Sequence, residues 1–167
     1  VEDLLGDARR LAREVLSIDE AIAGYDNNAQ ATLHVDEVDQ IGIVAMRVAA
    51  GVVPNVGSLL GCAHGANEQT CAKDFIRRFA RRAFRHPVSD DELAPYVAMY
   101  EEKRKATDHA QAIRLFVEAV LQSPRFLYRP IVGTSTNDPA VVKLTGYEVA
   151  TRLAFFLWAS VPDAELL

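Results

Sequence analysis

The sequence lacks the short motifs that most often identify a reaction. It contains no glycine-rich phosphate loop, no G-x-S-x-G nucleophile elbow, no H-E-x-x-H zinc motif and no C-x-x-C-H for covalent haem attachment. The four histidines are scattered rather than spaced as metal ligands, which favours surface or capping roles for them. They are His34, His64, His86 and His109. The sequence therefore identifies no catalytic residue, and we expect neither a metal nor a cofactor in this chain.

The chain also lacks a long uninterrupted apolar run. Arg, Asp or Glu interrupts each candidate before it reaches the roughly 20 residues that a membrane-spanning helix needs. Half of the 167 residues are hydrophobic, which is enough for the core of one domain or two small ones. We expect a soluble protein without a membrane span. Because the sequence starts at Val1 without a signal peptide and stops just after a new helix start at Asp163, we also expect a piece of a longer protein.

Strand signals are nearly absent, since the valine pairs at 52–53 and 141–142 are too short to count. Apolar residues instead recur at the i, i+3, i+4 spacing that places them on one face of a helix. Such stripes lie within residues 4–16, 35–49, 72–84, 93–100, 113–121 and 149–157. The sequence therefore predicts an all-α fold, a helical bundle of about six helices.

Local signals mark several helix ends. Ser89 with Glu92, and Thr145 with Glu148, have the S/T-x-x-E spacing of a capping box. Asp108 is suited to cap the helix that follows it. Residues 101–107, which are charged and polar, are expected to close the helix that Ser89 opens.

The last predicted helix carries a strongly apolar face. Val149, Leu153, Phe156 and Leu157 form its stripe, and we expect these four side chains to be buried. The neighbouring Trp158 extends an aromatic cluster that is typical of a core or a domain interface. Such a cluster would form an exposed apolar edge if a neighbouring domain were missing.

The pattern of helices and loops predicts four segments. Residues 1–56 form an N-terminal helical domain and residues 57–130 a three-helix domain. Residues 131–142, rich in Gly, Thr, Ser, Asn, Asp and Pro, form an exposed linker. Residues 143–167 then begin a following helical domain.

The chain has only two cysteines, Cys62 and Cys71, and they flank a polar loop at the start of a helix. This arrangement fits a short-range disulfide that would constrain the unfolded chain. Two free thiols are the alternative. A zinc site would need four ligands, and although His64 is near, the C-x-x-C spacing is absent.

The net charge of −5 is unevenly distributed. Residues 72–86 carry six cations against one carboxylate, so this segment has a charge of +5 and the rest of the chain −10. The cations are expected on the solvent face of the helix: Lys73, Arg77, Arg78, Arg81, Arg82 and Arg85. They either complement neighbouring acidic helices or bind a polyanion through Arg77, Arg78, Arg81 and Arg82. A pI near 5.4 and the lack of interleaved aromatics argue against nucleic acid.

A polar loop at residues 24–29 contains Asp26, Asn27 and Asn28. Their oxygen atoms are of the type that binds calcium, but the spacing is not that of an EF-hand loop. A turn capped by its own side chains is the alternative that the sequence favours.

Four stretches together resemble a known group of proteins. They are GYDNNA at 24–29, the segment from Cys71 that ends in FARRAFRHP at 79–87, LQSPRFLYR at 121–129, and LTGYEVATRLAFFLW at 144–158. Taken in order, they resemble the domains of unknown function found in large exported proteins of planctomycetes and myxobacteria. The last stretch resembles the opening of the next domain in those proteins.

This resemblance implies an exported protein, periplasmic or at the cell surface, often with a c-type cytochrome module elsewhere in the polypeptide. An oxidising compartment favours the Cys62–Cys71 disulfide. Any haem would lie in another part of a longer parent protein, because C-x-x-C-H is missing here. The resemblance carries over no catalytic residue.

Three functional hypotheses follow. The leading one is a non-catalytic helical structural or interaction module of an exported multidomain protein, serving a redox or cell-surface assembly, with other domains of the parent protein as its partners. The second is a fragment of an extracellular enzyme, active on carbohydrate or another polymer, whose site is completed by other domains. The third is a polyanion-binding module that uses the basic helix at 73–85. Neither the substrate nor the oligomeric state follows from the sequence.

Overall fold

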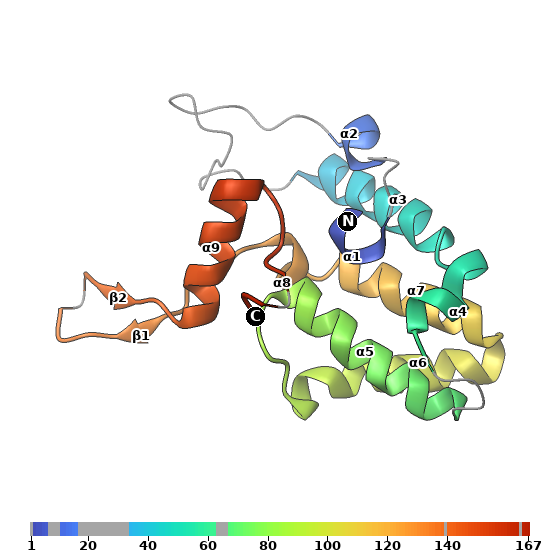
Figure 1. Ribbon diagram of the computed structural model, residues 1–167. Coiled ribbons are helices and arrows are strands. Elements are labelled where there is room, and N and C mark those ends of the chain that lie inside the picture. The colour runs from blue at the N-terminus through green and yellow to red at the C-terminus, as the bar shows by residue number, and fades with distance from the viewer. Residues whose placement is uncertain (1, 7–10, 17–33, 63–66, 139, 164) are drawn as a thin grey trace.

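The computed structural model of the protein describes residues 2–6, 11–16, 34–62, 67–138, 140–163 and 165–167. Apart from a two-stranded sheet, the regular structure in these residues is helical, so the predicted all-α fold is confirmed (Figure 1). The helices are α1 Glu2–Leu5, α2 Leu11–Val15, α3 Val35–Ala50, the 3₁₀ helix η1 Val53–Asn55, α4 Val56–Leu60, α5 Glu68–Phe84, α6 Asp90–Ala106, α7 His109–Leu121, α8 Pro124–Leu127 and α9 Gly146–Trp158. The strands are β1 Thr134–Ser135 and β2 Val142–Lys143.

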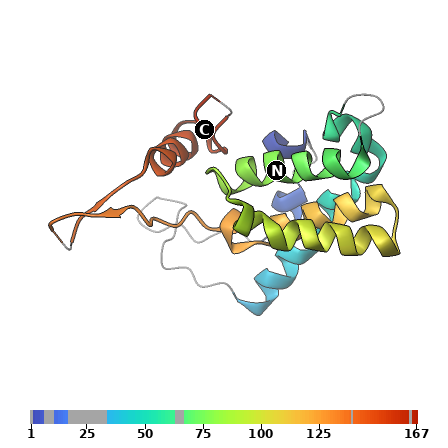
Figure 2. The same ribbon diagram turned by 90° about the horizontal axis from the view of Figure 1, so that it is seen from below.

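The core lies among α3, α5, α6 and α7. α7 contacts both α3 and α6, and α5 packs against α6 and α7 (Figures 1 and 2). The ring of Phe116 on α7 is fully buried and meets those of Phe75, Phe79 and Tyr96 edge-on at centroid distances of 6.0, 5.7 and 6.0 Å. Edge-to-face pairs of this kind add to the stabilisation that burial of the rings provides.

The sequence of α5 explains why it is the central helix. Its buried positions recur every three or four residues and follow the predicted stripe: Cys71, Ala72, Phe75, Ile76, Phe79, Ala80, Ala83 and Phe84. The helix begins earlier than the sequence indicated, because the Asn67 side chain accepts hydrogen bonds from the N–H groups of Gln69 and Thr70 at 3.0 and 3.1 Å. Such a side-chain cap satisfies N–H groups that have no partner within the helix.

The predicted caps of α6 and α7 are confirmed. The Ser89 hydroxyl accepts from Glu92 N–H at 3.3 Å, and Glu92 accepts from Ser89 N–H at 2.9 Å. Asp108 accepts from Gln111 N–H at 2.8 Å. α6 ends at Ala106 with Thr107 as its C-cap, within the charged stretch that is expected to close it. Residues 101–106 are exposed or half-buried helix, because acidic residues followed one turn later by basic ones, as in Glu101 and Lys105, are compatible with a solvated helical face.

The predicted single helix at 4–16 is wrong. α1 ends at Leu5, and Gly6 has a φ of +66°, a left-handed conformation that glycine adopts without steric cost and that interrupts a right-handed helix. α2 is a separate short helix. Leu4 is buried against the core, and α1 contacts α5.

The stretch Val35–Leu60 is long and apolar enough to cross a membrane by length and composition alone, with a mean hydropathy of 1.6. We did not expect such a stretch from the sequence, because charged residues interrupt each apolar run. This is weak support for a membrane span, since core helices pass the same test. In the structure α3 ends after 16 residues, about 24 Å, and η1 with Pro54 separates it from α4. α3 also buries Val44, Ala45, Val48 and Ala49.

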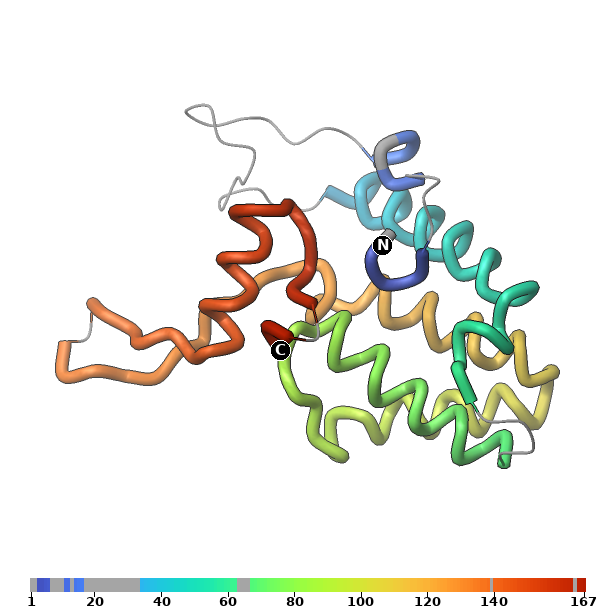
Figure 3. Tube along the Cα trace, in the orientation of Figure 1, coloured from blue at the N-terminus to red at the C-terminus, as the bar shows by residue number. Residues whose placement is uncertain are grey.

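The hairpin and α9 extend to one side of the bundle (Figures 1 and 2). Thr134 pairs with Lys143 and Ser135 with Val142 in an antiparallel register. The valine pair at 141–142, too short to count as a strand signal in the sequence, thus contributes Val142 to a sheet whose strands are only two residues long. Figure 3 shows the chain returning after α9 to end beside α5, where Arg81 Nη2 donates to the carbonyl oxygen of Leu167 at 2.8 Å.

Candidate functional site

An exposed apolar stripe on α9 is the most distinctive surface of the described residues. Val149, Leu153, Phe156 and Leu157 follow one another at spacings of four, three and one residues, so they share one helix face. All four are exposed, with Phe156 at 86% of its full accessible area. Trp158, the single tryptophan of the chain, is 63% exposed at the end of the same helix.

The expectation that these four side chains are buried is therefore wrong. α9 turns its small residues inward instead: Ala150, Thr151 and Ala154 are buried. The spacing of the apolar residues in the sequence identifies the stripe, but it does not show whether another part of the chain covers it. The rest of the described chain does not cover the stripe, and contiguous exposed apolar surface of this kind marks interaction sites.

The first turn of α9 is fixed to the hairpin by one carboxylate. Glu148 Oε2 accepts from Thr145 N–H at 2.7 Å and from the Thr145 hydroxyl at 2.8 Å, which confirms the predicted capping box. Glu148 Oε1 accepts from the N–H groups of Gly133 and Val132 at 2.8 and 2.7 Å. These hydrogen bonds, led by those from the Thr145 and Gly133 backbones, lower the pKa of Glu148 to about 2. The sequence predicts the cap but not the bonds to the hairpin.

Two further contacts join α9 and the residues after it to the rest of the molecule. The guanidinium carbon of Arg129 lies 4.6 Å from the centroid of the Phe155 ring, a cation–π geometry. After α9 ends, the Ser160 hydroxyl donates to the Asp3 carboxylate. The helix is thus fixed mainly through its two ends and Phe155, while its apolar stripe faces solvent.

Arg85 does not lie where the sequence predicts it. The sequence predicts it on the solvent face of the basic helix, yet it is 5% exposed and ends α5 in a left-handed conformation with a φ of +65°. Its guanidinium donates to the carbonyl oxygens of Arg125 and Tyr128, each at 2.7 Å, and of Phe126 at 3.1 Å. Burial, and to a lesser degree the charge of Arg129, lower the pKa of Arg85 to about 10. No sequence pattern distinguishes Arg85 from the exposed arginines before it.

The four arginines proposed as an anion site each have a partner in the molecule. Arg77 pairs with Asp90 at 2.5 Å. Arg78 donates to the Leu60 carbonyl at 2.6 Å, Arg82 to the Asp3 carbonyl at 2.5 Å, and Arg81 to the Leu167 carbonyl. The basic face therefore connects α5 to α1, α4 and α6.

The predicted disulfide is confirmed. Cys62 and Cys71 are bonded, with their Cα atoms 6.0 Å apart, and the bond links the end of α4 to the first turn of α5. Asp26, Asn27 and Asn28 lie outside the described residues. Within the described residues, no three His, Cys, Asp or Glu side chains are grouped so that they could hold a metal ion.

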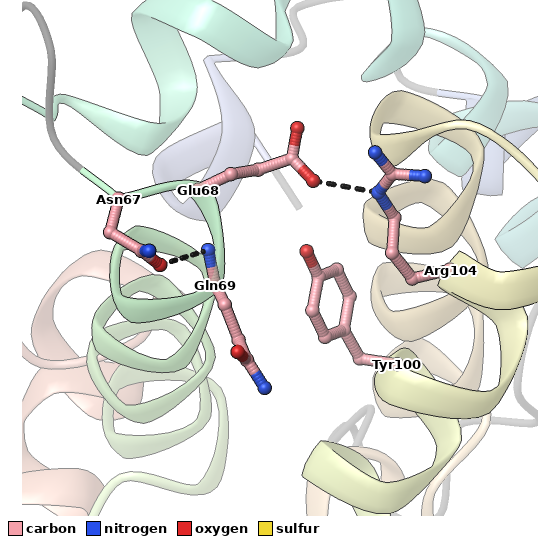
Figure 4. Close-up of a pocket in the computed structure, with 5 residues that line it drawn as sticks. All are labelled: Asn67, Glu68, Gln69, Tyr100 and Arg104. Carbon is pink, nitrogen blue, oxygen red and sulfur yellow. Dashed lines mark hydrogen bonds and ion pairs between the residues drawn. The ribbon is translucent and has the colours of Figure 1, made fainter.

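A shallow polar depression of about 330 Å³ lies where α5 begins, beside α6 (Figure 4). Glu68 accepts from Arg104 Nε at 2.6 Å, and the Tyr100 hydroxyl lies 2.9 Å from His109 Nδ1. The hydrogen bond from Arg104 lowers the pKa of Glu68, and burial raises the pKa of Tyr100. Asn67 and Gln69 complete the lining. Because its two charged groups are bonded to each other and its phenol to His109, this depression offers little to a ligand.

Comparisons with known proteins divide the chain into two matched stretches. Residues 71–130 match a family model described as PSD5, protein of unknown function (DUF1595). Residues 144–167 match a second, described as PSD4, protein of unknown function (DUF1592). The expected resemblance to domains of unknown function is therefore confirmed. No curated protein and no solved structure matches this chain.

Proposed function

We propose that this chain is a non-catalytic helical interaction module of an exported multidomain protein, and that the apolar stripe of α9 is its contact surface. The observation that carries the proposal is the exposure of Val149, Leu153, Phe156 and Leu157 along one face of a well-capped helix. Exposing an apolar stripe of this length to water is unfavourable in free energy. A partner that covers the stripe removes this apolar area from water, and the burial stabilises the complex.

The occupant of the stripe is an amphipathic helix from another domain of the same polypeptide. α9 lies in the second matched stretch, which begins at residue 144, and not in the first, which contains most of α5 and all of α6 and α7. Within that stretch α9 buries only Ala150, Thr151 and Ala154. Side chains so small supply little of the apolar area that a folding unit needs. Of the larger apolar side chains of α9, Phe155 is half-buried, whereas those of the stripe and Trp158 are exposed. A further helix that covers the stripe would therefore add most of the apolar area that this unit can bury.

Export is supported by the disulfide. A bond between Cys62 and Cys71 persists in an oxidising compartment and is rare where thiols are kept reduced. The module is therefore proposed to lie in the periplasm or at the cell surface, as in the exported planctomycete and myxobacterial proteins that the sequence resembles. In such a protein the module would serve a redox or cell-surface assembly, and haem would be held by a separate cytochrome module.

The other two hypotheses receive less support. A polyanion site on the basic helix would have to displace the partners of Arg77, Arg78, Arg81 and Arg82. An enzyme site completed by other domains would need reactive groups with no partner, whereas in the described depression Glu68 is bonded to Arg104 and Tyr100 to His109.

The test is binding in trans between this chain and the remaining part of the parent polypeptide, measured by calorimetry. The double variant Phe156→Ser, Leu157→Ser is compared with a control, Val38→Ser, Met46→Ser, which changes two exposed apolar residues of α3. We expect the α9 variant to lose at least about tenfold in affinity, or 1.4 kcal/mol, and the control to bind normally. Equal binding of both variants would contradict the proposal. Self-association that the α9 variant abolishes would instead identify a second copy as the occupant, and binding of phosphatidylcholine vesicles a lipid surface.

A further inference from the structure

Arg85 is a buried cation whose partners are three backbone carbonyls of one short segment. The three bonds, to Arg125, Phe126 and Tyr128, hold the last turn of α8 and the residue that follows it. Carbonyl groups at the end of a helix lack intrahelical partners and carry partial negative charge. The guanidinium satisfies these groups, and they in turn compensate its charge. An arginine is suited to this role because its planar fork presents several N–H donors at once.

The same turn is also held from α6. The side chain of Arg125 pairs with Glu92, the carboxylate that caps α6. The main chain of residues 125–128 is thus bonded to α5 and the side chain of Arg125 to α6. The turn therefore cannot rotate relative to the bundle without loss of bonds on two helices.

The segment that leads to α9 begins at this turn. Tyr128, whose carbonyl Arg85 binds, is followed by Arg129, whose guanidinium lies over the Phe155 ring of α9. Val132 and Gly133 then donate to Glu148 in the first turn of α9. A continuous series of contacts therefore runs from the end of α5 to α9, although 61 residues lie between the two helices in sequence.

We infer that Arg85 is the positioning residue of the α9 contact surface: by fixing the turn at 125–128 it sets the direction in which the stripe faces. This inference rests on the proposed function of the stripe. It assigns Arg85 a role in orientation, which is separate from any contribution to the stability of the bundle. Its side chain does not itself touch the partner, because it is buried.

The test is ¹⁵N relaxation of the whole chain, which reports the tumbling of α9 and of α5–α7 separately and needs no partner. The variants are Arg85→Met, Arg85→Lys and Arg129→Ala, with Arg77→Met as the control on the exposed face of α5. We expect α9 to tumble with the bundle in the unmodified protein and in the control. In Arg85→Met, the correlation time of α9 should fall by at least about a third relative to that of α5–α7, on the nanosecond scale of segmental motion.

Arg85→Lys should give an intermediate value, because one ammonium group cannot reproduce the three bonds. Arg129→Ala keeps the core intact and should also loosen α9. If Arg85→Met fails to fold, Arg85→Lys and Arg129→Ala decide the question. Unchanged tumbling of α9 in the folded variants, or independent tumbling of α9 in the unmodified protein, would overturn the inference. If a variant loosens α9 but binds the remaining part of the parent polypeptide with unchanged affinity in calorimetry, the result would instead count against the proposed function of the stripe.

Discussion

The Oε1 atom of Glu148 accepts a hydrogen bond from the backbone N–H of Gly133 at a distance of 2.8 Å. The same atom accepts from Val132, so one carboxylate joins the hairpin to the N-terminus of α9. The hairpin and α9 therefore form one structural unit beside the bundle, and the chemistry of this carboxylate determines how firmly they are joined.

The first prediction concerns acid. The folded-state pKa of Glu148 is about 2, below the ordinary value of 4.5. The stability that its hydrogen bonds contribute is therefore fully present above about pH 4.5 and is lost as the pH falls through 2, where the folded-state carboxylate is protonated. We expect the amide chemical shifts of Val132 and Gly133 to titrate with a midpoint near pH 2 in NMR spectra. Glu148→Gln should abolish this titration. A midpoint near pH 4.5 would show that the bonds do not form.

The second prediction concerns Gly133, which has a φ of +53°. A Cβ atom there would lie 2.9 Å from the carbonyl oxygen of Lys143, across the hairpin. Gly133→Ala should therefore open the hairpin, at a cost of about 1–2 kcal/mol for the left-handed backbone alone. Limited proteolysis between residues 131 and 143 should become faster. Gly57→Ala is the control, since Gly57 lies in α4 and a methyl group there would have no neighbouring atom within 4 Å, and it should leave the cleavage rate unchanged.

The third prediction contrasts two phenylalanines. Phe116 is fully buried among three aromatic rings, and Phe156 is 86% exposed. Phe116→Ala should lower the free energy of unfolding by about 3–5 kcal/mol, whereas Phe156→Ala should change it by less than about 0.5 kcal/mol. Urea denaturation followed by circular dichroism measures both. A large loss for Phe156→Ala would mean that α9 is buried against the bundle in solution.

The fourth prediction concerns the disulfide. Cys62 and Cys71 close a loop with a sequence separation of 9 residues. In the chain-entropy account, reduction should lower the free energy of unfolding by about 2.5 kcal/mol. The paired variant Cys62→Ala, Cys71→Ala should show a similar loss without reductant, and reductant should not affect it further. A reduced protein as stable as the oxidised one would contradict the role of the bond as a constraint on the unfolded chain.

The helices of the bundle could be predicted because their signals are local. Ser89 and Asp108 cap helices through bonds to residues three positions away, and the α5 stripe depends only on the spacing of its own apolar residues. The interruption at Gly6 does not follow from the sequence, because a single glycine within an amphipathic pattern is compatible with either a helix or its end.

The orientation of α9 and the burial of Arg85 could not be predicted, because both depend on residues distant in sequence. The partners of Arg85 lie at least 40 residues further along the chain. The α9 stripe has the same period whether a neighbour covers it or not. The sequence therefore reveals the apolar stripe as a pattern, and only the arrangement of the helices shows that it faces solvent.

The measurement that tests the central claim most directly is amide hydrogen exchange of α9, compared between this chain and its full parent polypeptide. If the stripe is covered by a helix of another domain, the amides of residues 149–158 should exchange at least about tenfold more slowly in the parent, while those of α5–α7 exchange at similar rates in both. Equal exchange of α9 in the two proteins would contradict the claim that this helix is the contact surface.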